Sequence, residues 1–181
     1  MKKNLFLVFA ALSALALSAC GGDDLDQQAA SQAMAEAMSA GSTAYSKVGA
    51  EMGKLDGNWV TGTASSFTIS GTVTNPTGSG AASVTGTGSK AGTGFKMDLK
   101  MAFADWKSAQ GLVLNGTLNM SYDVTSMTTF NYTMKYSGDL EVSGTASGTA
   151  SFDLTITYGG IGQVKVCGTV GGVDVSYGGS C

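Results

Sequence analysis

The most informative absences in this 181-residue chain are those of histidine and arginine. Without histidine, the chain lacks the side chain that most often serves as a general base near neutral pH and as a transition-metal ligand. All ten basic residues are lysines, so there is no guanidinium to grip nucleic-acid phosphates, and 13 acidic residues outnumber them. We therefore expect a protein that is not an enzyme, holds no metal or cofactor and binds no nucleic acid.

Known catalytic and phosphate-binding motifs are also missing. The string Gly78-Ser79-Gly80 lacks the Gly-x-Ser-x-Gly spacing of a serine hydrolase, and no histidine is present to activate a serine. Residues 86–94 (GTGSKAGTG) are glycine-rich, but Lys90 is followed by Ala91, where a P-loop needs serine or threonine. We interpret residues 86–94 as containing a turn between strands.

The first 19 residues have the features of an export signal. Lys2 and Lys3 precede an apolar run from Leu5 to Leu17, which is shorter than the roughly 20 residues of a membrane-spanning helix. The run ends in the sequence Leu17-Ser18-Ala19-Cys20. A branched apolar residue, two small residues and a cysteine resemble the lipobox of bacterial lipoproteins.

This resemblance implies that residues 1–19 are removed and that Cys20 carries a diacylglycerol at the new N-terminus. The protein would then lie in the bacterial cell envelope, bound to a membrane through its lipid. Gly21, in place of aspartate, implies sorting to the outer membrane. An ordinary secretory peptide that happens to end beside a cysteine is the alternative. The chain without residues 1–19 has 8 lysines against 13 acidic residues, a formal net charge of −5.

The other two cysteines, Cys167 and Cys181, form an even pair in a protein expected to be exported to an oxidising compartment. We predict a disulfide bond between them, which would stabilise the fold by up to roughly 3 kcal/mol in the chain-entropy model. Two free thiols are the alternative.

The sequence predicts an acidic tether in residues 20–26 and a helical segment in residues 27–56. The second range is rich in alanine, glutamine, methionine and glutamate, and its larger apolar residues recur at helical spacing. These residues are Met34, Met38, Tyr45, Val48, Met52 and Leu55. Gly41 occupies the missing position of this stripe, so we expect a break in the helix there. The stripe is expected to pack on the core.

Residues 57–181 predict an antiparallel β domain, because the hydrophobic period changes to two. Met97, Leu99 and Met101 alternate with charged residues, and the same alternation recurs in residues 112–124, 130–142 and 152–158. Turn-forming residues separate these segments at Asn75-Pro76, at Ser108 to Gly111, at Gly159-Gly160 and at Gly171-Gly172. This pattern indicates about eight strands.

Several polar and aromatic residues have two possible roles in this domain. The strand residues Asp98, Asp123, Asp139, Glu141, Asp153 and Asp174 are expected to point outward as solvated charges, not to pair as glycosidase carboxylates. We expect Trp59 and Trp106 to pack at the edge of the core; the alternative is that either stacks on a sugar or a partner.

Glycines at apolar-face positions, such as Gly71, Gly116 and Gly168, indicate bends or close contacts. The sequence thus predicts a mainly β (α+β) fold, a curved antiparallel sheet or small barrel of about eight strands packed on an N-terminal helix. The expected function is that of a membrane-anchored, non-enzymatic binding or structural module with an envelope protein as a possible partner. A carrier with an apolar ligand or lipid between sheet and helix is the alternative. A transmembrane β-barrel ranks third, since the chain ends in Gly-Gly-Ser-Cys181 without a terminal aromatic residue.

Overall fold

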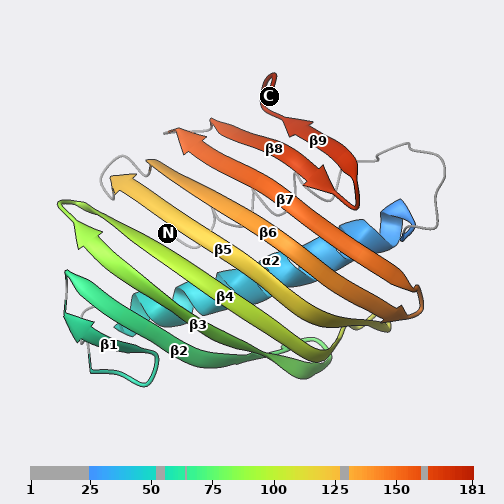
Figure 1. Ribbon diagram of the computed structural model, residues 1–181, viewed down its shortest axis with the longest axis horizontal. Helices are drawn as coiled ribbons and strands as arrows, with labels where there is room; N and C mark the ends of the chain where they lie inside the picture. The colour runs from blue at the N-terminus through green and yellow to red at the C-terminus, as the bar shows by residue number, and fades with distance from the viewer. Residues whose placement is uncertain (1–24, 52–55, 64, 127–130, 160–162) are drawn as a thin grey trace.

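In the part of the chain that the structure describes, a single curved β-sheet has one long helix across its concave face (Figure 1). The computed structural model describes residues 25–51, 56–63, 65–126, 131–159 and 163–181. Within these residues the sheet is antiparallel and follows chain order from β1 to β9, so it is open, with β1 and β9 at its edges. The mainly β fold and the curved sheet are confirmed; the chain forms the open sheet and not the closed barrel.

The described residues form nine strands, one more than the approximate number predicted from the sequence. They are β1 (Val60–Thr63), β2 (Ser66–Thr74), β3 (Ser79–Ala91), β4 (Gly94–Lys107), β5 (Leu112–Ser126), β6 (Asn131–Gly144), β7 (Gly148–Gly159), β8 (Val164–Val170) and β9 (Val173–Tyr177).

Short connections produce this simple topology, because neighbouring antiparallel strands need only a tight turn between them. Gly171 and Gly172 form the two-residue turn between β8 and β9, and both have positive φ, at 56° and 75°. The glycine-rich segment proposed as a turn is the β3–β4 hairpin, in which Gly92 has a φ of 59°. The interpretation of this segment as a turn is therefore confirmed.

Alternation of apolar and polar residues gives the sheet two chemically different faces. In β4, for example, Met97, Leu99 and Met101 are buried, whereas Lys96 and Lys100 are exposed. The apolar side chains of the concave face form one core with the helix. The acidic strand residues lie on the opposite, convex face, as the alternation predicts.

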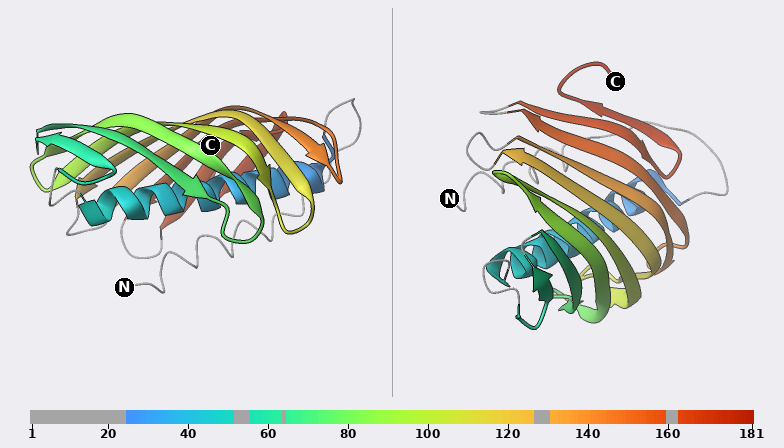
Figure 2. Two further views of the ribbon diagram at one scale, coloured as in Figure 1. Left: turned by 90° about the horizontal axis from the view of Figure 1, so that it is seen from below. Right: turned by 60° about the vertical axis from the view of Figure 1, so that its left-hand side comes forward.

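Helix α2 (Gln27–Glu51) covers the concave face diagonally, and small side chains bring the two layers close together (Figure 2). Its buried residues are mainly alanines: Ala29, Ala30, Ala33, Ala37, Ala40 and Ala44, with Met34, Met38, Gly41 and Val48. Asp26 caps the N-terminus, since its Oδ1 accepts a hydrogen bond of 2.8 Å from the backbone N–H of Ala29.

The expected break at Gly41 is wrong, because α2 continues through this residue. A Cβ at Gly41 would lie 2.8 Å from Sδ of Met120 on β5, so glycine lets this methionine side chain lie directly against the helix. Tertiary packing therefore offsets the weak helix propensity of glycine at this position. Met52 and Leu55, the last residues of the predicted stripe, lie outside the described residues.

The glycines at apolar positions of the strands have two structural roles. Gly71 leaves room for Trp59, whose indole carbons lie only 2.4 Å from the position of a Cβ. Gly116 pairs with the buried residues Phe103 and Leu140, but it is itself exposed and has a φ of 121°. Its positive φ, and not burial of the residue, is therefore the reason for glycine there.

Candidate functional site

The C-terminal corner of the sheet contains the predicted disulfide bond. Cys167 on β8 and Cys181 are bonded; their Cα atoms are 5.7 Å apart, and the two residues are 14 positions apart in the sequence. This bond ties the chain that follows β9 back to β8, across the edge strand. The prediction of the cysteine pair from the sequence is confirmed.

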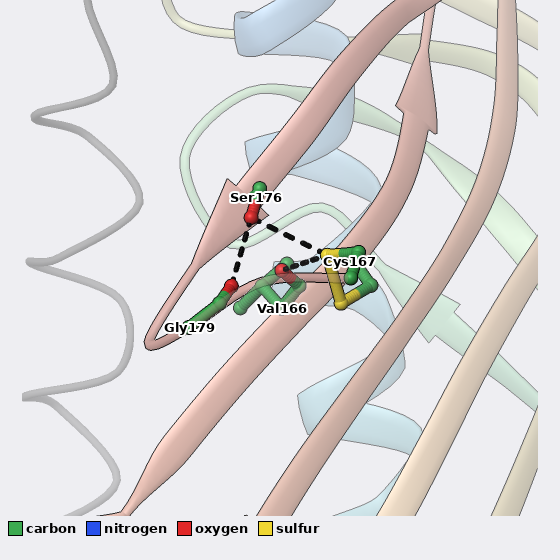
Figure 3. The surroundings of a disulfide bond; sticks show 5 residues. Val166, Cys167, Ser176 and Gly179 are labelled. Carbon is green, nitrogen blue, oxygen red and sulfur yellow. Dashed lines mark hydrogen bonds between the residues drawn. A yellow bond between two sulfur atoms is a disulfide. The ribbon is translucent and has the colours of Figure 1, made fainter.

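The last residues fold against the convex side of β9, around Ser176 (Figure 3). The Ser176 hydroxyl donates a hydrogen bond of 3.0 Å to the backbone carbonyl of Gly179. Sγ of Cys181 lies 3.3 Å from Oγ of Ser176 and 3.7 Å from the carbonyl oxygen of Val166. The disulfide and these contacts fix the C-terminal segment and fasten the edge strand.

An open recess of about 650 Å³ lies at this corner, where β7 and β9 end and β8 begins. Its volume lies within the usual range for small-molecule sites, roughly 300–1,000 Å³. The lining residues are Thr157, Gly159, Gln163, Val164, Lys165, Tyr177 and Gly178. They come from β7, β8 and β9, with Gln163 directly before β8 and Gly178 directly after β9. The disulfide and the sheet hydrogen bonds hold these strands together.

The polar side chains of this recess make no hydrogen bonds within the described part of the chain. Thr157, Gln163, Lys165 and Tyr177 are exposed. Thr157 and Lys165 are paired on the convex face, whereas Tyr177 is paired with the buried Val166 and shares its concave face. Tyr177 is 44% exposed, and it is the one large apolar side chain classed as exposed among the described residues. Sequence reasoning missed this recess, because Thr157 and Tyr177 are 20 positions apart and only the strand pairing brings their strands together.

Tyrosine side chains gather on the concave face near the same ends of the strands. Tyr132 on β6 and Tyr158 on β7 are stacked, with ring centroids 5.1 Å apart and an angle of 7° between the planes. Tyr45 of α2 contacts Tyr122 on β5, at 5.2 Å between centroids. This tyrosine cluster, Tyr45, Tyr122, Tyr132, Tyr136 and Tyr158, contains five of the six tyrosines of the chain.

Burial within the tyrosine cluster makes ionisation of the phenols unfavourable. Desolvation raises the pKa of Tyr122 well above its usual value, and the neighbouring Tyr136 raises it further. Desolvation also raises the pKa of Tyr45, Tyr132 and Tyr136. These four phenols are therefore neutral near physiological pH. The cluster forms a weakly polar aromatic surface, which is buried at Tyr122 and Tyr136 and partly exposed at Tyr132 and Tyr158.

The two tryptophans pack in the fold. Trp106 is fully buried, and its Nε1–H donates a hydrogen bond of 2.9 Å to Oε2 of Glu36 on α2. Trp59 is half-buried over Gly71, and its backbone N–H donates to Oε2 of Glu51, 2.6 Å away. The packing role preferred for the tryptophans is confirmed, although Trp106 lies in the core and not at its edge.

The convex face carries its charges unevenly. Asp139 and Glu141 lie toward one end of the strands, where β6 ends, whereas Lys135 and Lys165 lie toward the other end. Lys96 forms an exposed ion pair of 2.8 Å with Asp123, and Asp123 raises the pKa of this lysine. Among the described residues, Lys165 has no such partner, so its charge is available to a ligand.

The proposed lipidation site, Cys20, lies outside the described residues. Over the part of the chain that the structure covers, no helix is long and apolar enough to cross a membrane. Those same residues include no group of three or more histidine, cysteine, aspartate or glutamate side chains placed to hold a metal ion. The absence of a catalytic site, a metal and a cofactor stays a prediction.

Comparison with known proteins assigns no family to the chain. No protein-family model matches it, and neither the curated proteins nor the solved structures give a match.

Proposed function

We propose that the protein is a lipid-anchored envelope lipoprotein whose β domain acts as a non-enzymatic binding or structural module. The sequence Leu17-Ser18-Ala19-Cys20, which lies directly before an acidic tether and a folded domain, is the observation that carries this proposal. Two or more acyl chains on Cys20 would hold the module firmly at a membrane. Gly21 favours the outer membrane as its location.

The start of the folded domain supports this arrangement. Leu25 is buried and lies against Gly148 in β7, at 3.1–3.2 Å from the position of a Cβ on that glycine. Cys20 precedes Leu25 by only five residues, which span at most about 18 Å when extended. A lipid on Cys20 would therefore keep the β6–β7 end of the sheet close to the bilayer.

The opposite end of the strands would then face away from the membrane. Thr157 is nine residues after Gly148 on β7, which corresponds to about 30 Å along the strand. The recess and the partly exposed Tyr132 and Tyr158 lie at this distal end. Such an arrangement suits a module that presents a binding surface to a partner in the envelope.

The carrier alternative requires volume between the sheet and the helix. Contacts between the two layers include Met120 against Gly41 and the hydrogen bond from Trp106 to Glu36. An apolar ligand would have to displace α2 from the sheet, with loss of these contacts. Native mass spectrometry with lipid extraction tests this alternative, and a stoichiometric co-purifying lipid would favour the carrier over the module.

Mass spectrometry of the N-terminus tests the anchor directly. We expect the mature protein to begin at Cys20 and to carry the mass of a diacylglycerol. A Cys20→Ser variant should keep residues 1–19, because the lipid on the thiol precedes cleavage in the lipoprotein pathway that the resemblance implies. Fractionation of the membranes should place the wild-type protein in the outer membrane.

A Cys181→Ser variant serves as the matched control, since it removes a different cysteine and leaves the signal unchanged. We expect this variant to be lipidated and cleaved like the wild type. An unacylated Cys20, or cleavage at another residue, would contradict the proposal.

A further inference from the structure

We propose that the disulfide bond between Cys167 and Cys181 is a redox-controlled latch on the edge strand β9. When a dithiol reductant opens this bond, β9 leaves the sheet, and the freed edge of β8 pairs with β8 of a second copy of the chain. The inference goes beyond the proposed function and does not depend on the lipid anchor.

Strand β9 is weakly held by its own contacts. It has five residues, pairs with β8 alone among the described strands, and buries a single side chain, Val175. Every residue from Ser176 to Cys181 is exposed. Each ordered residue loses conformational entropy, so one buried valine and a short ladder leave β9 only marginally bound to the sheet.

The disulfide attaches β9 to β8 at a second point. One end of β9 is joined to β8 through the turn at Gly171 and Gly172, and the other end returns through Cys181 to Cys167 in the middle of β8 (Figure 3). If β9 detached with the bond intact, the chain would remain a loop closed on β8 at both ends. Such a loop gains less conformational entropy than a free end and stays beside the edge of β8.

Reduction can begin at Cys181, because this residue is exposed whereas Cys167 is half-buried. A thiolate of the reductant attacks Sγ of Cys181, the bond between the two protein sulfur atoms breaks, and Cys167 leaves as a thiolate. The second thiol of the reductant then attacks the reductant sulfur of the mixed disulfide and releases Cys181. The reductant becomes a disulfide, and its two protons pass to the two protein thiolates.

Loss of β9 would expose an apolar strand edge. The side chains of Val166 and Val170 on β8 are only 1% and 4% exposed, and each lies opposite a residue of β9 in the register. The backbone groups of β8 that bond to β9 would lose their partners at the same time. An unpaired edge that carries β-branched apolar side chains is a template for another strand.

A second copy of β8 is the partner that the geometry favours. A strand can pair with its own copy in antiparallel orientation across a two-fold axis, which gives a closed and self-complementary contact. The other edge of the sheet is less available, because Asp56 already pairs with Thr61 on the outer side of β1. In the oxidised protein β9 is also a poor edge, since it is short and fastened at its end. We therefore expect the oxidised protein to be a monomer and the reduced protein to be a dimer.

Hydrogen exchange and light scattering test the latch on the mature protein in detergent. A Cys167→Ser/Cys181→Ser variant mimics the reduced state and cannot form disulfides between copies at these positions. We expect the amides of β9 to exchange about 100-fold faster in this variant than in the oxidised wild type, and before the amides of β4 and β5. Size-exclusion chromatography with light scattering should detect a dimer of the variant and a monomer of the oxidised wild type.

A charge on the freed edge tests whether the copies pair through β8. Thr169→Lys, added to the double variant, places an ammonium group on β8 of both copies, so dimerisation should weaken by about fivefold. Thr61→Lys is the matched control, because it places the same charge on β1 at the other edge of the sheet. We expect this control to dimerise like the double variant.

Exchange of the β9 amides only together with those of β4 and β5 would overturn the latch, because β9 would then leave only when the whole domain unfolds. A dimer of the oxidised wild type, or a double variant that stays monomeric, would overturn redox-controlled pairing. Equal effects of the two lysine substitutions would overturn pairing through β8. Wild-type protein reduced with dithiothreitol gives the same comparison without a mutation, and loss of the whole fold on this reduction would also overturn the proposal.

Discussion

The hydrogen bond between Glu36 and Trp106 offers a direct test of how the helix is attached to the sheet. The indole Nε1–H is buried and donates to Oε2 of Glu36 over 2.9 Å. Glu36→Ala removes the acceptor and leaves this donor without a partner inside the core. Glu36→Gln keeps an acceptor oxygen and removes only the charge.

The expected magnitude follows from the burial of the donor. A buried donor without an acceptor costs about 1–3 kcal/mol, and a hydrogen bond to a charged group contributes about 1.5–3 kcal/mol. We therefore expect Glu36→Ala to lower the free energy of unfolding by about 2 kcal/mol, and Glu36→Gln to lower it by less than about 1 kcal/mol. This is a large part of the roughly 5–15 kcal/mol that stabilises a typical domain.

Trp106→Phe removes the same hydrogen bond from the other side, and it also reduces packing in the core. If the hydrogen bond couples the two residues, the double variant loses about 1–2 kcal/mol less than the sum of the single variants. Urea unfolding, followed by far-ultraviolet circular dichroism, measures all four free energies without relying on tryptophan fluorescence.

Gln28→Ala is the control, because Gln28 is an exposed residue on the same helix. Its free energy of unfolding should stay within about 0.5 kcal/mol of the wild-type value. The reasoning is refuted if Glu36→Ala unfolds at the wild-type urea concentration, or if the two single changes are additive.

Four further predictions concern the core, the turns and the disulfide. Gly41→Val should lower the free energy of unfolding by about 1–3 kcal/mol, because its side chain would collide with a methionine of the sheet; unchanged thermal unfolding would contradict this. Gly116→Val should lower the free energy of unfolding by about 1–3 kcal/mol, because valine is strained at the positive φ of this position; unaltered urea unfolding would contradict this. Cys181→Ser should lower the free energy of unfolding by up to about 3 kcal/mol, and reduction of the disulfide in the wild type should lower it by the same amount. In the folded state the pKa of Tyr122 is raised above its value of 10.0 in the unfolded chain. The free energy of unfolding is therefore constant with respect to this group below pH 10 and falls as pH rises above 10. Tyr122→Phe should therefore move alkaline unfolding to higher pH, as measured by circular dichroism and by absorbance of ionised tyrosine; an unchanged midpoint would refute this assignment.

Much of the fold was predictable because its pattern is local. Alternation in residues 95–103 and 152–158 identified strands, since the side-chain period of a strand follows from backbone geometry. Helix propensity correctly assigned the small residues of α2 to a helix. The sequence pattern did not reveal that the alanines of α2 are the main residues buried against the sheet. Gly41 was misjudged because propensity does not register the proximity of Met120.

The candidate site was predictable only in part. Cys167 and Cys181 were paired correctly, because two cysteines in an oxidising compartment leave few alternatives. The recess was not predicted, since Thr157, Lys165 and Tyr177 become neighbours only through the pairing of three strands. A sequence signal for it was present in the turn glycines around these residues, but such glycines also occur at ordinary turns.

Trp106 shows most clearly where the sequence stops being sufficient. By itself, the chain determined the strands, the helix and the cysteine pair, because hydrophobic period, propensity and residue chemistry act over short distances. Strict alternation from the buried Phe103 would place Trp106 on the convex face. A β-bulge shifts the register between these two residues, with Asp105 at a φ of 48° and its N–H bonded to Asn115, and this shift directs Trp106 into the core. Only the tertiary structure decided that placement, because the bulge depends on a partner strand and the helix carboxylate that receives the indole hydrogen bond.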